Sequence, residues 1–521
     1  MPNPHSRQEA ASTIPAAETP PTTTHTGTPT MTDREVALAM IALIASMFVA
    51  MLSNLVVLTA MPRIAADLHA GQAEYTWIIT SSMLTIAVCT PIWGRVSDLV
   101  DKKLLMQICV GGYVVFSFLA SMAPHAWFII ACRVGIGVCA GGIIVLLQTI
   151  SAAIMSPRKR ARWIGYRAAA LSVATVGAPS FGGLVTEHLG WRACFLVGIP
   201  FALASIAMLQ KTLHLPRGHG TRPRIDWAGA LLLAGGIVCL MLWVSVTGPR
   251  AGFLAPPSLA LLGGGLALLA VAVAVELKVA VPILPVGLFR QHEVLMCVVA
   301  SSGIGIGMFG SAVFLAPYLQ IGRGLEPAAA GLMALPEAAG SLLASILTAR
   351  ILSRRGHYRG TLVVGGALLV GGFAMLSTLD THTPFVLIGS YVAFVGAGLG
   401  ITGETLTIVV QNAVARGHAG SAGALVAFFR MLGGITGVAV LGAVLSGHVQ
   451  RAVAASGLGP LRDGAVPLLA QLAPPLRMVV QSGYCSGVAL LYLSCVPIAM
   501  VTLAALALLP RGVLSDDDPL A

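Results

Sequence analysis

The chain is dominated by long apolar runs that alternate with short polar stretches. Fourteen of these runs are about 20 residues long, which is the length that an α-helix needs to cross the hydrocarbon core of a bilayer. The predicted spans are 37–61, 75–95, 104–123, 126–150, 165–186, 193–213, 226–247, 258–277, 293–317, 328–350, 360–379, 384–410, 420–447 and 484–509. The pattern therefore predicts an all-α integral membrane protein with 14 transmembrane helices.

Composition supports the same class. Of the 521 residues, 56% are hydrophobic and only 10% are charged, and the mean hydropathy is +0.87. Soluble domains carry about 25% charged residues. The net charge of +11 would suit nucleic-acid binding, but the basic residues lie in short loops between the apolar runs. That distribution indicates membrane orientation, so we predict a lipid bilayer and no nucleic acid as partner.

Lysine and arginine are unevenly distributed between alternate loops. They are abundant in the loops after the second, fourth, sixth and tenth spans, including the run 158–162, and sparser in the loops between them. Because juxtamembrane basic residues stay inside, and an even number of spans places both ends on one side, we predict that both termini are cytoplasmic. The Ala-, Gly- and Arg-rich composition favours a bacterium, and hence the bacterial cytoplasmic (inner) membrane.

The ends of the chain and its cysteines suggest little chemistry. Residues 1–36 are predicted to be a disordered N-terminal tail, rich in Pro, Thr and Ala, and 510–521 a C-terminal tail. All nine cysteines lie in or beside apolar runs without metal-ligand spacing, so we expect no metal site and no cofactor. Neither a catalytic dyad nor a Walker A phosphate loop is present in the sequence, so we predict a protein that is not an enzyme and is not driven by ATP.

The loop between the second and third spans combines one glycine with several charges: Gly94, Arg95, Asp98, Lys102 and Lys103. Gly94 permits two helix ends to approach closely, and Asp98 either caps the N-terminus of a neighbouring helix or pairs with Arg95. The loop resembles the G-x-x-x-D-x-x-G-[RK]-[RK] loop of major facilitator superfamily transporters, with Asp101 in place of the second glycine. The resemblance implies a conformational gating loop, and the alternative is an ordinary basic inside loop.

Several further stretches resemble one branch of that superfamily, the fourteen-span drug:proton antiporters. The match includes Leu52, Ala60, Pro62 and Ile64 in the first span and the stretch 428–434. It implies a major facilitator fold with two six-helix halves, at 37–213 and 279–509, and a linker with two extra helices at 214–278. It also implies a hydrophobic small-molecule substrate, protons as the coupling ion, and a monomer.

A glycine-rich element in the fifth span points to the direction of transport. Gly177, Pro179, Gly182 and Gly183 resemble the G-P-x-x-G-G element of exporters in the superfamily. Small residues let helices pack backbone to backbone, and the proline kinks the span. The resemblance implies export, whereas the competing interpretation is simple Gly-rich helix packing.

Four ionisable residues are predicted to lie inside the bilayer. A charge there is costly, so each of these residues is a candidate for a functional role. Arg133 either couples to protons or substrate or ties backbone carbonyls. Glu337 lies about 13 Å into the tenth span at 1.5 Å per residue, next to Pro336, and a carboxyl desolvated there would bind and release protons near neutral pH. Its alternative role is to line a water-filled cavity and attract cations. Glu404 and Arg430 are predicted either to take part in proton coupling or substrate binding or to form a purely structural ion pair.

Together these features predict a proton-coupled secondary transporter that exports a hydrophobic or cationic drug or antibiotic by alternating access. A second hypothesis is an exporter of a lipid or endogenous metabolite without strong proton coupling, because Ser53 stands where related first spans carry an aspartate. A membrane enzyme or receptor is a third and weaker alternative.

Overall fold

The computed structural model describes residues 31–70, 72–214, 227–243, 255–276, 286–325, 327–415, 418–456 and 474–514. These residues form helices joined mostly by short turns, as the long apolar runs predict. In chain order the helices are α1 (Asp33–Asp67), α2 (Gln72–Leu99), α3 (Lys102–Ser121), α4 (Ala126–Ile154), α5 (Pro157–Ala161), α6 (Trp163–His188), α7 (Trp191–Leu196), α8 (Gly198–Thr212), α9 (Trp227–Leu242), α11 (Pro256–Glu276), η2 (Val286–Arg290), α12 (His292–Pro317), η3 (Tyr318–Gly322), α13 (Pro327–Leu332), α14 (Leu335–Arg355), α15 (Tyr358–Leu376), α16 (Phe385–Ala413), α17 (Ala419–Ala455) and α18 (Pro474–Leu508).

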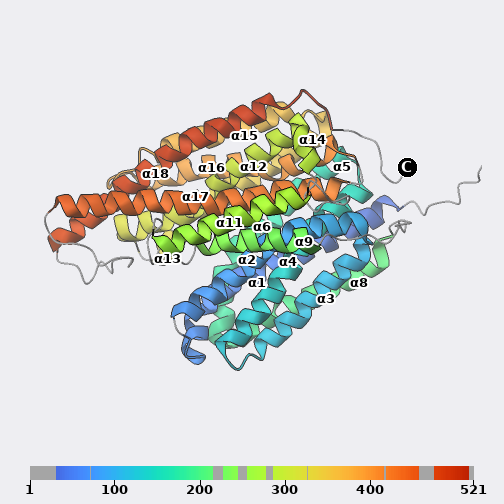
Figure 1. Ribbon diagram of the computed structural model, residues 1–521, viewed down its shortest axis with the longest axis horizontal. Helices are drawn as coiled ribbons and strands as arrows, with labels where there is room; N and C mark the ends of the chain where they lie inside the picture. Colours follow the sequence, from blue (N-terminus) through green and yellow to red (C-terminus); the bar gives the residue numbers. More distant parts are fainter. Residues whose placement is uncertain are drawn as a thin grey trace, which may run out of the picture.

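The helices gather into two bundles (Figure 1). The N-terminal bundle, blue to cyan-green, is formed by α1–α8, and its buried side chains make one continuous hydrophobic core. The C-terminal bundle, yellow to red, is formed by α12–α18 around a second core. Helices α9 and α11 pack against each other, and a small apolar cluster joins α9 to α2 and α17. Each bundle therefore has its own main core, and Ala161 of α5 and Ile164 of α6 pack into the second core where the bundles meet.

Twelve helices in the described part of the chain are long and apolar enough to cross a membrane. The all-helical membrane fold predicted from the sequence is confirmed. Helices α6 and α9 fall on the other two predicted ranges without meeting the same length and hydropathy requirement. The count of fourteen spans consequently stays a prediction.

Several predicted boundaries are wrong by some residues. Helix α1 begins at Asp33, inside the predicted tail, because Thr32 and Glu35 form a reciprocal capping box. Helices α17 and α18 reach Ala455 and back to Pro474, so they take up part of the loop predicted at 448–483. Residues 466–473 of that loop lie outside the described residues, and 474–483 belong to α18.

The tenth predicted span is not one continuous helix. It divides into α13 and α14 at a turn over Met333 and Ala334, with Pro336 in the first turn of α14. Proline lacks the N–H for an intrahelical bond and is tolerated in the first turn of a helix, which explains the position of the break. The break places Glu337 in the first turn of α14 and not deep within an uninterrupted helix.

Candidate functional site

The two bundles are tied together at one end, called here the basic end. It carries the loop between α2 and α3, the short helix α5 and the turn after α14, with Lys102, Lys103, Arg158, Arg354 and Arg355. Four sets of polar contacts between described residues of the two bundles lie there, and each joins a residue of the N-terminal bundle to a helix of the C-terminal bundle.

The first contact is made by Asp98, near the end of α2. Its Oδ1 accepts a hydrogen bond from the backbone N–H of Gly420 at 3.0 Å, and its Oδ2 accepts from the N–H and the hydroxyl of Ser421 at 2.9 and 2.6 Å. Both residues lie in the first turn of α17, where N–H groups lack intrahelical partners and the helix dipole favours negative charge. Of the two roles predicted for Asp98, capping is the one observed.

Gly94 lets α2 and α17 approach closely enough for this cap. A Cβ at Gly94 would overlap the side chain of Ala424 and lie 3.2 Å from the Gly420 carbonyl oxygen. The neighbouring Arg95 is buried. Asp101, which replaces the second glycine of the related loop pattern, caps α3 by accepting from the N–H groups of Lys103 and Leu104. The loop residues therefore divide between a bridge to α17 and a local cap.

The second contact places Arg158 of α5 at the end of α14. Its Nε donates to the Ser353 carbonyl oxygen at 3.1 Å, and its Nη2 donates to the Arg354 carbonyl oxygen. Carbonyls in the last turn of a helix lack intrahelical donors and carry the negative end of the dipole, so a guanidinium group fits them. A carboxylate at one helix start and a guanidinium at another helix end thus join the bundles by complementary charge.

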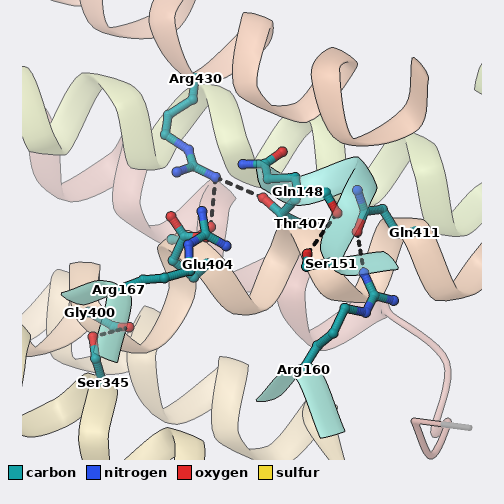
Figure 2. Close-up of polar contacts among 11 residues, drawn as sticks. Gln148, Ser151, Arg160, Arg167, Ser345, Gly400, Glu404, Thr407, Gln411 and Arg430 are labelled. Carbon is teal, nitrogen blue, oxygen red and sulfur yellow. Dashed lines mark hydrogen bonds and ion pairs between the residues drawn. The ribbon is translucent and has the colours of Figure 1, made fainter. Parts of the chain in front are cut away.

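The third and fourth contacts involve buried arginines and are drawn in Figure 2. Nη1 of Arg160, the fourth residue of α5, donates to Oε1 of Gln411 in α16. Arg167 of α6 forms an ion pair with Glu404 of α16, with 2.8 Å between Nη1 and Oε2. The Arg167 side chain is 9% exposed and that of Glu404 27% exposed, so the pair is shielded from most solvent.

Because Arg167 lies beside other cations, loss of the Glu404 carboxylate should lower the stability of the protein more than loss of the Arg167 guanidinium group. We expect Glu404→Gln to lower stability by about 2 kcal/mol, since it leaves a buried guanidinium group unpaired. The double variant Arg167→Gln/Glu404→Gln should recover much of that loss. Thermal unfolding of the purified protein, analysed as a double-mutant cycle, measures the coupling. Additive single effects would show that the pair contributes nothing specific.

Arg430 does not pair with Glu404 as predicted. Its Nη2 donates to the Gly403 carbonyl oxygen at 2.6 Å and to the Thr407 hydroxyl at 3.4 Å. Glu404 faces Arg167 of the other bundle because α6 packs against α14 and α16 at this end. The prediction of an ion pair within the C-terminal bundle is therefore wrong, and the carboxylate bridges the two bundles instead.

Arg133 is fully buried between α4 and α2. Its Nε donates to the Ile78 carbonyl oxygen at 2.9 Å and its Nη2 to the Ile79 carbonyl oxygen at 3.4 Å. These bonds satisfy some of the donors of the guanidinium group, whose charge would otherwise be costly in an apolar bundle. They correspond to the structural alternative stated for Arg133, and a role in proton or substrate coupling stays a prediction.

Glu337 lies among helices α12, α14 and α16 of the C-terminal bundle. Its Oε1 accepts a hydrogen bond from the Ser311 hydroxyl of α12 at 2.9 Å, and its side chain is half-buried. Helices α14 and α16 approach closely, since a Cβ at Gly396 would overlap the Glu337 carbonyl oxygen. No lysine or arginine among the described residues pairs with this carboxylate. The group is thus held by a neutral donor, although its role in proton coupling stays a prediction.

The glycine-rich element of the fifth predicted span lies in α6. The carbonyl oxygen of Gly182 accepts from the Thr186 hydroxyl at 2.6 Å. A Cβ at Gly177 or Gly183 would meet no described atom within 4 Å, so the close helix packing predicted for these two residues is absent in this conformation. Pro179 is inside α6, and its side chain lies outside what the structure describes.

Sequence reasoning missed Arg160, Arg167 and Gln148, which line a small cavity between the bundles. The sequence predicts Arg160 and Arg167 to be inside-loop charges that only set the orientation. Their spacing of seven residues, two helical turns, was the available signal, because it can place both on one face of a helical segment. The sequence predicts that Gln411 marks the inner boundary of its span, but the residue is a buried partner of Arg160.

Two bundles of membrane-spanning helices that meet across a polar interface define a two-bundle membrane transporter. A model of the Major Facilitator Superfamily matches residues 43–438, and the chain belongs to this superfamily.

Individual relatives cover most of the chain. The multidrug transporter protein MdtP of Bacillus subtilis is 28% identical, over 78% of this chain and 74% of its own length. The tetracenomycin C resistance and export protein of Streptomyces glaucescens is 28% identical, over 89% and 90% of the two chains. The crystal structure of the human organic anion transporter MFSD10 has the same fold, with a TM-score of 0.56, 14% identity, and coverage of 89% of this chain and 99% of that one.

Proposed function

We propose that this protein is a proton-coupled exporter of a hydrophobic or cationic drug or antibiotic in a bacterial cytoplasmic membrane. Its basic end would face the cytoplasm, as the distribution of lysine and arginine predicts. Relatives named for multidrug transport and for tetracenomycin C resistance and export support the substrate class. The protein would work as a monomer, with substrate bound between the bundles.

The observation that carries the proton part of this proposal is the environment of Glu337. A carboxylate inside a membrane-spanning bundle is costly unless it is paired or neutralised. Glu337 is held by the hydroxyl of Ser311 and not by a cation of the described chain. A proton is the species that neutralises such a group reversibly, so Glu337 is the proposed proton-binding residue.

The contacts at the basic end support an alternating-access cycle. Asp98 on α17, Arg158 on α14 and the Arg167–Glu404 pair join the bundles on the proposed cytoplasmic side. All of them must break for substrate to enter from the cytoplasm and reform when it leaves on the opposite side. The gating role predicted for the loop at 94–103 fits this cycle.

Transport by the purified protein in liposomes tests the proposal. With ethidium as a fluorescent probe, we expect transport that requires a pH gradient across the membrane and stops when a protonophore is added. Liposomes without protein and liposomes with the gradient collapsed are the controls.

Transport that is independent of the gradient would contradict proton coupling and favour the second function, an exporter of a lipid or metabolite. Buried Ser53, in place of a first-span acid, is the observation that favours this second function. The absence of transport for ethidium and for a set of lipid-like and antibiotic probes would contradict both.

A further inference from the structure

Three guanidinium groups and one carboxylate meet where the two bundles join. This group, called here the arginine cluster, consists of Arg160 on α5, Arg167 on α6, Arg430 on α17 and Glu404 on α16 (Figure 2). Glu404 pairs with Arg167 and also acts electrostatically on Arg430. Two of the three positive charges therefore remain uncompensated within the cluster.

The guanidinium groups of the cluster are largely removed from solvent. Arg160 is 6% exposed and Arg167 8% exposed, and Arg430 is half-buried. Burial lowers the pKa of Arg160 to about 10, and the nearby charge of Arg167 adds to the shift, yet the group remains charged at neutral pH. Burying like charges together is unfavourable unless a counter-charge joins them.

The cluster also contains hydrogen-bond donors that are not satisfied. Nε of Arg160, Arg167 and Arg430 and the side-chain nitrogen of Gln411 are buried without a hydrogen-bond partner among the described residues. Buried donors in native proteins are nearly always satisfied, so several unused N–H groups in one place point to a ligand that accepts hydrogen bonds.

A small cavity lies against these groups. Its polar lining comes from Gln148, Ser151, Arg160, Arg167, Thr407 and Gln411, and Trp163 adds an aromatic wall. The cavity measures about 10 Å³, which is the space of one water-sized particle. A drug-sized compound does not fit it in this conformation, whereas a monatomic ion requires only a small displacement of flexible side chains.

We infer that the arginine cluster binds a small monovalent anion of the chloride class between the two bundles. The N-terminal bundle contributes Arg160 and Arg167 to this site, and the C-terminal bundle contributes Gln411 and Thr407, whose hydroxyl accepts from Arg430. An anion held by both sides compensates the buried positive charge and stabilises the closed arrangement of the basic end. The site is distinct from Glu337 and does not depend on the transported substrate.

The thermal stability of the purified full-length protein tests this site without any transport assay. Chloride should raise the Tm saturably, by about 2 °C or more, relative to gluconate at the same ionic strength. Arg160→Gln should lose the response while gaining stability in gluconate, because it removes an uncompensated charge. Glu404→Gln should enlarge the response, because it leaves three cations unpaired. Arg162→Gln, an exposed change of the same charge next to α5, is the matched control and should respond like the wild type.

Bromide quenching of Trp163 fluorescence is a second measurement, with Trp163→Phe as its blank. It should saturate with the same anion dependence as the Tm and be lost in Arg160→Gln. Equal Tm in chloride and gluconate would overturn the inference, as would an equal loss of response in Arg162→Gln and Arg160→Gln. Stabilisation by benzoate but not by chloride would also overturn it, and would assign the cluster to the carboxylate of an organic substrate.

Discussion

Replacing Glu337 with glutamine is expected to abolish ethidium export driven by a pH gradient, with a fall in rate of at least about tenfold. Glutamine keeps the size of the side chain and can still accept from the Ser311 hydroxyl, but it cannot take up or release a proton. The variant should therefore fold and bind substrate while losing the energetic link to the gradient. Initial rates of transport in liposomes with an imposed pH gradient measure the effect.

Exchange of labelled for unlabelled substrate without a gradient should persist in Glu337→Gln, which separates lost coupling from lost folding. Glu187→Gln is the matched control, because Glu187 is an exposed acid at the end of α6. It should transport like the wild type. Unchanged gradient-driven export in Glu337→Gln would remove this carboxylate from the mechanism and leave the two-bundle transporter architecture unaffected.

The second large effect is expected at the cap on α17. Asp98→Asn replaces one accepting oxygen with a donor that faces the N–H groups of Gly420 and Ser421, and it removes the negative charge from the helix start. Hydrogen bonds to charged groups contribute about 1.5–3 kcal/mol each. We expect the closed basic end to lose about 2 kcal/mol, which weakens it about thirtyfold, and export to fall because the bundles no longer reclose reliably.

Hydrogen exchange measured by mass spectrometry tests this prediction directly. The amides at the start of α17 should exchange faster in Asp98→Asn. Asp101→Asn is the matched control. It removes the same charge three residues later, but Asp101 caps α3 within its own bundle. Equal protection of the α17 amides in wild type and Asp98→Asn would show that the cap does not hold the bundles together.

Features that depend on local interactions could be predicted from the sequence, and features that depend on distant parts of the chain could not. The spans were predictable because a run of about 20 apolar residues leaves helix across a bilayer as the main solution. The cap by Asp98 and the close approach at Gly94 were predictable because both residues lie in one short stretch whose chemistry favours helix ends. The sequence could not indicate that α17 is the helix that Asp98 caps, since the partner lies in the other bundle.

The least predictable features depended on depth and on packing between the bundles. Arg167 was interpreted as a loop charge, although it is buried and pairs with Glu404. The sequence predicts that Pro336 loosens the backbone within one span, whereas the chain divides there into α13 and α14 and Glu337 lies at a helix start. In each case the outcome depends on which helix surfaces face one another, and a one-dimensional pattern does not specify that.

The sequence by itself determined that this protein is a helical membrane transporter of the major facilitator type, because hydrophobic run length and a local loop motif both act over short distances. Only the tertiary structure decided which charges pair across the bundles and which remain uncompensated. That division has a physical reason: apolar burial is a property of each segment, whereas the energy of a buried charge is set by neighbours that come from distant parts of the chain.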